Sequence, residues 1–150
     1  MLRFLRGKKA LAGLAIAGGA SLAAVGSATP ALGFFSPPLL LQIHVTSPAT
    51  LVAKGAGAKV TVKFQCAGAK TATVRVKLTE RSGNTIAKGS GSALVGCTNR
   101  NQNTVVTVTN HSTKPFKVGS TLAKGVISGC TPNLKVCGKE VAQRTIKISK

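Results

Sequence analysis

Four side chains of this 150-residue sequence could supply acid–base chemistry: the imidazoles of His44 and His111, and the carboxylates of Glu80 and Glu140. Enzymes use carboxylates as general acids and bases and as groups that orient a histidine. Here each glutamate stands beside a basic residue in the sequence, and we expect both to act as local partners of these cations. The chain also contains no Trp and no Tyr. We therefore expect a protein that is not an enzyme and has no catalytic residues.

The four cysteines, Cys66, Cys97, Cys130 and Cys137, form an even set. In an exported protein such a set predicts two disulfides. Three pairings are possible, and we favour Cys66–Cys97 with Cys130–Cys137 because each closes the shortest available loop along the chain. A zinc site is the alternative, but neither C-x30-C nor C-x6-C is a common zinc-finger spacing. We expect no bound metal.

A glycine-rich segment at residues 89–96 is the remaining candidate for a cofactor site. Leu94 stands where the third glycine of a G-x-G-x-x-G motif would be. The segment also leads into a loop, and no helix follows whose N-terminus could hold a phosphate. We expect a strand of small residues here and no cofactor.

The first 28 residues have the composition of an export signal. Four basic residues precede the apolar run Ala10–Val25, and Gly26-Ser27-Ala28 offers small residues for a cleavage site. An uncleaved membrane anchor is the alternative, but the run has 16 residues and about 20 are needed to span a bilayer. We expect cleavage, secretion to the extracellular space and no transmembrane anchor in the mature protein. Removing these four of the 21 basic residues leaves 17 against two acidic ones, a net charge of +15.

Apolar and polar residues alternate over most of the remaining chain. After an irregular Pro-rich lead-in at residues 29–38, Val60 and Val62 lie on one face of a stretch whose other face carries Lys59 and Lys63. This period of two predicts antiparallel strands that turn their apolar sides inward. We expect an all-β domain over residues 39–150, an immunoglobulin-like sandwich of two sheets with seven or eight antiparallel strands and two disulfides. The clearest stretches are residues 41–45, 59–66, 72–80, 85–94, 103–109, 122–130 and 140–149.

Several of these segments resemble small exported immunoglobulin-like β-sandwich proteins of high-GC Gram-positive bacteria. The segments are residues 60–66, residues 89–92 leading to Cys97, residues 105–109, and residues 115–119 before Cys130. The resemblance implies a sandwich fold and export. It implies no particular function, because no defined activity belongs to that group.

The basic charge is the strongest functional signal. A cationic surface attracts polyanions without choosing among them, so we expect a monomeric protein that binds wall polymers, acidic glycans or lipid headgroups. A self-repelling surface that only keeps the protein soluble is the alternative. Specific nucleic-acid binding is not expected, because the only aromatic residues are five Phe and base stacking needs an aromatic platform. The expected contact residues are Lys59, Lys63, Arg75, Lys77, Lys117 and Lys147.

The loop between Cys130 and Cys137 suggests a second hypothesis. A short loop closed by a disulfide and containing Pro132 loses little entropy when it binds a partner. Leu134 and Lys135 would be its contact residues, in a protein-binding module or a protease inhibitor. A pinned hairpin turn is the structural alternative. A carrier of a small apolar ligand, held in a cleft between the sheets, is a third hypothesis.

Overall fold

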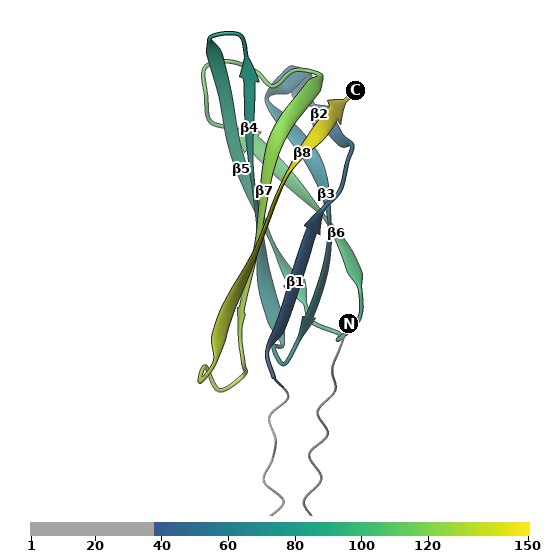
Figure 1. Ribbon diagram of the computed structural model, residues 1–150, viewed down its shortest axis with the longest axis vertical. Helices are drawn as coiled ribbons and strands as arrows, with labels where there is room; N and C mark the ends of the chain where they lie inside the picture. The colour runs from purple at the N-terminus through teal and green to yellow at the C-terminus, as the bar shows by residue number, and fades with distance from the viewer. Residues whose placement is uncertain (1–37) are drawn as a thin grey trace, which may run out of the picture. The chain divides into compact units, whose positions relative to one another are not determined.

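A computed structural model describes residues 38–150 (Figure 1). The predicted export signal at residues 1–28, and all of the predicted lead-in except Pro38, lie outside the described residues. Each of the seven stretches predicted from alternation forms a strand, and the short strand β2 is an addition. The elements are β1 (Leu40–Val45), β2 (Ala49–Val52), the 3-10 turn η1 (Ala53–Gly55), β3 (Gly57–Ala67), β4 (Thr71–Ser82), β5 (Thr85–Gly96), β6 (Gln102–Asn110), β7 (Gly119–Cys130) and β8 (Cys137–Ser149).

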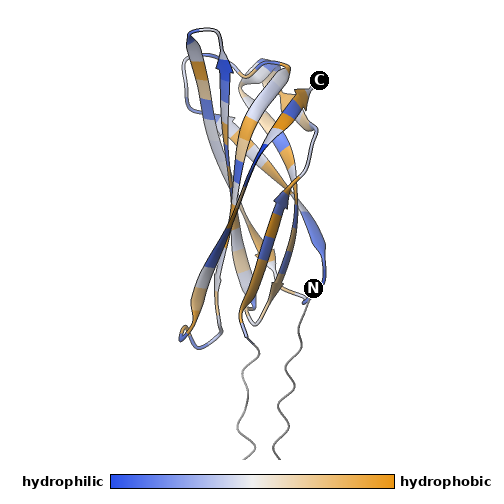
Figure 2. Cartoon of the chain, in the orientation of Figure 1, coloured by the Kyte–Doolittle hydropathy of each residue, from blue (hydrophilic) through white to orange (hydrophobic). Residues whose placement is uncertain are grey.

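The strands form because their side chains suit a half-buried pleated surface. Hydrophobic and hydrophilic residues follow one another along the strands (Figure 2). In β3, Val60 and Val62 are fully buried while Lys59 and Lys63 are exposed. Successive side chains of a strand point to opposite faces, and β-branched residues are favoured there. The alternation therefore determines which side chains enter the core.

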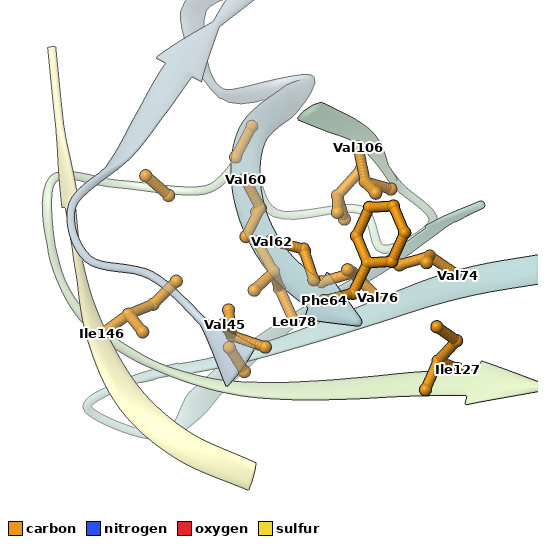
Figure 3. Packing of buried hydrophobic residues seen from close by; sticks show 14 of the residues in the cluster. Val45, Val60, Val62, Phe64, Val74, Val76, Leu78, Val106, Ile127 and Ile146 are labelled. Carbon is orange, nitrogen blue, oxygen red and sulfur yellow. The ribbon is translucent and has the colours of Figure 1, made fainter. Parts of the chain in front are cut away.

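The core is built from aliphatic side chains and two phenylalanines. Strands β3 and β4 contribute the largest share, and Phe64, Val74 and Val76 all belong to this buried cluster (Figure 3). Ile127 of β7 and Ile146 of β8 are also buried. Each such side chain removed from water stabilises the fold by about 1.5–3 kcal/mol. The core therefore stabilises the sheet, and the polar residues lie on the outer surface of that sheet.

The predicted two-sheet antiparallel sandwich is wrong, because the strands close into a mixed barrel. Seven strands follow one another in the order β3-β2-β8-β7-β4-β5-β6, and β6 pairs again with β3. The pair β2–β8 is parallel, whereas the other pairs are antiparallel. Strands β1 and β2 pair with the same edge of β3, β2 with its first residues and β1 with its later ones. A sandwich and a barrel share the same alternation along each strand, so alternation does not distinguish them.

The ring is completed by two short contacts between strands, the parallel pair β2–β8 and the pair β5–β6. Strands β5 and β6 are joined only at the pairs Gly89↔Asn110 and Ser90↔Thr109. Glycines allow this approach: a Cβ at Gly89 would lie 2.8 Å from Cζ of Phe116, and a Cβ at Gly91 would overlap the carbonyl oxygen of Thr107. The glycine-rich segment is therefore part of a strand, as expected, and its glycines are needed where two backbones meet.

Both disulfides form with the predicted pairing, Cys66–Cys97 and Cys130–Cys137. The first ties the end of β3 to the residue after β5, across a sequence separation of 31. The second joins directly paired residues at the β7–β8 turn. In the chain-entropy model, the long loop closed by the first bridge, Cys66–Cys97, stabilises the fold by about 3–4 kcal/mol. The first bridge therefore links two strands that are not neighbours in the ring, since β6 lies between them.

The close approach at Gly91 leads to a test of the β5–β6 contact. We expect Gly91→Ala to lower the free energy of unfolding by about 1–3 kcal/mol, because the added methyl group forces β5 away from β6. Gly96→Ala is the matched control, since Gly96 is also in β5 and a Cβ there meets nothing within 4 Å. Urea unfolding of both variants measures the difference. Equal stability of the two would show that the contact does not need a glycine.

Candidate anion-binding face

The two carboxylates do not act as the local partners that we expected. Glu80 is 6% exposed, and its Oε2 accepts a hydrogen bond of 2.9 Å from the backbone N–H of Lys117. Alternation places the neighbouring Arg81 on the opposite, exposed face of β4. Glu140 of β8 pairs in register with Ile127 of β7 and is exposed, and alternation places its neighbour Lys139 on the opposite face of the strand. Glu80 therefore holds the loop before β7.

The two histidines lie on different strands and contact different partners. Nε2 of His44 lies 2.9 Å from Nη1 of Arg144, which can only donate. Nε2 of His111 lies 2.9 Å from Oγ of Ser90. A hydroxyl beside an imidazole is one part of a catalytic triad, but Glu80 is hydrogen-bonded elsewhere. Within residues 38–150 there is also no group of three potential metal ligands.

The barrel separates the six basic residues predicted as contacts. Lys59 and Lys63 lie on β3, while Arg75 and Lys77 lie on β4, which is at least three strands away around the ring. The other two are placed singly, in the loop before β7 and on β8, and both are exposed. The residues Lys59, Lys63, Arg75, Lys77, Lys117 and Lys147 thus form no single patch.

A different set of basic side chains does come together, on the outer face of β5, β4 and β7. Lys77 of β4 is directly opposite Lys124 of β7, so their Cβ atoms are about 4.5–5.5 Å apart. Arg75 lies two residues before Lys77, and Lys88 of β5 is diagonal to it because Lys88 pairs with Thr79. We call Arg75, Lys77, Lys88 and Lys124 the basic cluster.

No acidic side chain shares the outward positions of this cluster in the part of the chain that the structure describes. The row through Lys77 and Lys124 continues to Ser90 on β5 and Gln143 on β8. Like charges directly opposite each other in a sheet are destabilising. Sequence reasoning missed Lys88 and Lys124, because only the pairing of β4 with β5 and β7 brings them to Lys77.

The loop between Cys130 and Cys137 displays the two predicted contact residues. Leu134 is 75% exposed and Lys135 is exposed. The buried Thr131 fixes the loop, because its backbone N–H donates to the carbonyl of Val136 and its Oγ1 accepts from the N–H of Val136. Leu134 has a φ of 56°, a left-handed conformation. The loop is thus held by hydrogen bonds of its own, and a partner for it stays a prediction.

Comparisons with known proteins leave the chain without a family. No known family model and no curated protein matches it. The solved structure of AggA, the major subunit of aggregative adherence fimbriae type I from Escherichia coli, is similar over 76% of this chain and 96% of that chain, with 13% identity and a TM-score of 0.37. That likeness is too weak to carry an argument. The resemblance to exported immunoglobulin-like proteins stays a prediction.

Two observations bear on the compartment. Both disulfides fit an oxidising environment outside the cytoplasm. Among residues 38–150 no helix has the length and apolarity required to cross a bilayer.

Repulsion between Lys77 and Lys124 can be measured by reversing one charge. We expect Lys124→Glu to raise the free energy of unfolding by about 0.2–1 kcal/mol, because a like-charge pair becomes an opposite-charge pair, and added salt should reduce the gain. Lys59→Glu is the control with the same change in net charge, since Lys59 is flanked by Thr50 and Thr107. Denaturant unfolding at low and high salt gives both values. If Lys124→Glu gained no more than Lys59→Glu, the two ammonium groups would not interact.

Proposed function

We propose that this protein is a secreted, non-enzymatic binding protein that attaches to anionic polymers or surfaces through the basic cluster. The observation that supports the proposal is the direct opposition of Lys77 and Lys124 on a face where, within residues 38–150, the paired outward positions carry no acidic side chain. The repulsion between these two ammonium groups lowers the stability of the folded protein. An anion held between the two ammonium groups would replace their repulsion with two attractions.

The spacing of the cluster allows its charges to act together. Neighbouring strands are about 4.8 Å apart, and residues two apart along a strand are separated by about 6.6 Å. Both lengths are below the screening length of about 8 Å at physiological ionic strength. An anionic chain that lies across β5, β4 and β7 would therefore meet all four cations at once.

The cluster has the chemistry for a partner whose anionic groups vary in position. Lysine carries a compact charge on a flexible stem, and Lys77, Lys88 and Lys124 can each follow a mobile anion. Arg75 adds a planar fork that binds a carboxylate or phosphate through two hydrogen bonds. Together with predicted export, this favours wall polymers, acidic glycans or lipid headgroups as partners of a monomeric protein.

The remaining hypotheses have weaker support. Substrate-like inhibition through Leu134 and Lys135 requires an extended segment, whereas Leu134 has a left-handed backbone conformation. A carrier of an apolar ligand requires a cleft between two sheets, whereas the described strands form one closed sheet. Both ideas stay predictions that direct assays can address.

Inorganic polyphosphate is a suitable probe, because it offers charge and almost no other chemistry. We expect the double variant Lys77→Gln/Lys124→Gln to bind it about tenfold more weakly than the unchanged protein. The plot of log affinity against log salt should become shallower by about two, one for each lost contact. Titration at several salt concentrations measures both quantities.

The control is Lys59→Gln/Lys150→Gln, which removes the same charge from exposed positions outside the basic cluster. An equal loss in the control would mean that total charge, and not the cluster, determines binding. Affinity that does not depend on salt would exclude the electrostatic mechanism altogether.

A further inference from the structure

A second polar surface lies on the outer face of β1, β3 and β6, away from the basic cluster. In one row, Lys63 of β3 is directly opposite His44 of β1 on one side and Asn103 of β6 on the other. In the next row, Gln65 of β3 is opposite Gln42 of β1, and Asn101 lies just before β6. We call these six residues, Gln42, His44, Lys63, Gln65, Asn101 and Asn103, the polar grid.

The polar grid surrounds a hollow in the surface. An open depression of about 460 Å³ is lined by all six residues, together with Ile43 and Phe64 from the inward-facing positions of β1 and β3. The grid extends over about 10 Å across the three strands and about 6.6 Å along them. The six residues therefore border one open site.

The composition of the polar grid is not explained by folding. Asparagine is depleted in strands, and the outer face of a barrel does not require amides. Within residues 38–150 no hydrogen bond to another residue engages the side chains of Gln42, Lys63, Asn101 or Asn103. These groups are available to a ligand.

Two members of the polar grid are held in place by neighbours. Gln65 donates from Nε2 to the backbone carbonyl of Asn99 at 3.1 Å, which leaves its Oε1 as a free acceptor. Arg144 donates to Nε2 of His44 at 2.9 Å, so the imidazole proton is on Nδ1 and can be donated. Groups positioned in this way lose less conformational entropy on binding.

We propose that the polar grid is a glycan-binding site for a hydroxyl-rich chain with few acidic groups. Each of the four amides both donates and accepts hydrogen bonds, as sugar hydroxyls do. A phosphate polymer only accepts hydrogen bonds, so it would leave the amide oxygens without a donor. Lys63, in the centre of one row, is the only lysine or arginine among the six residues and matches one carboxylate among many hydroxyls. The class of ligand is therefore a polysaccharide containing uronic acid.

This inference adds a second site to the proposed function and names a narrower ligand for it. The basic cluster recognises charge, whereas the polar grid recognises hydroxyl groups beside a charge. The two proposals make different predictions for two probes: hyaluronan oligomers, which alternate a uronic acid with an N-acetylated sugar, and inorganic polyphosphate.

The test compares these two probes on charge-neutral variants. We expect Gln42→Leu/Asn103→Leu to bind labelled hyaluronan oligomers at least tenfold more weakly than the unchanged protein at physiological ionic strength, because hydrogen bonds are lost while the charge is kept. Its affinity for polyphosphate should change by less than about twofold. Fluorescence anisotropy measures both affinities, and the melting temperature verifies folding.

The control is Thr107→Val, an exposed position of β6 that pairs with Lys59 and does not line the depression. It should bind both probes as the unchanged protein does. Gln65→Leu/Asn101→Leu is a second variant that should repeat the selective loss of hyaluronan binding. Undiminished hyaluronan binding in both variants, or an equal loss for both probes, would overturn the glycan site and leave the basic cluster untouched. Absence of hyaluronan binding by the unchanged protein would also overturn it, whereas absence of polyphosphate binding would count against the basic cluster.

Discussion

The barrel depends on hydrogen bonding between strands that are far apart in the sequence. A curved sheet has two free edges unless its first and last strands meet, and unpaired edges invite association with other chains. Here the edges meet where β5 approaches β6, and that approach is possible because Gly89 and Gly91 have no Cβ. The parallel contact of β2 with β8 completes the ring on the other side. Every surface described above follows from the neighbours that this ring creates.

The scarcity of acidic residues acts on this ring in a specific way. With two glutamates in the chain, most outward lysines have no opposite charge to pair with. One glutamate is also withdrawn into the interior, where it holds the backbone of Lys117. The register then determines which cations repel one another, and Lys77 and Lys124 are the pair that it places directly opposite. Burial of the aliphatic core and two disulfides can offset such a repulsion, because each contributes more than one like-charge pair removes.

The barrel therefore presents two outer faces with different chemistry. The face of β5, β4 and β7 offers cations, and strong dependence on salt follows from that. The face of β1, β3 and β6 offers amides, which donate and accept and are much less sensitive to salt. A ligand with both hydroxyls and acids could use both faces, and the two contacts would reinforce each other if a single polymer reached both.

Local features of this protein could be read from the sequence, because they depend on neighbours along the chain. The period of two identified seven strands and, in strands such as β3, the buried face as well, as Val60 and Val62 illustrate, and the cysteine spacing identified both bridges. Closure was decided only in three dimensions, since a sandwich and a barrel share the same alternation and differ in which distant edges bond. The basic cluster and the polar grid also belong to the tertiary structure. Lys124 and Asn103 acquire their neighbours through pairing with β4 and β3, and the energy of that pairing comes from the whole sheet.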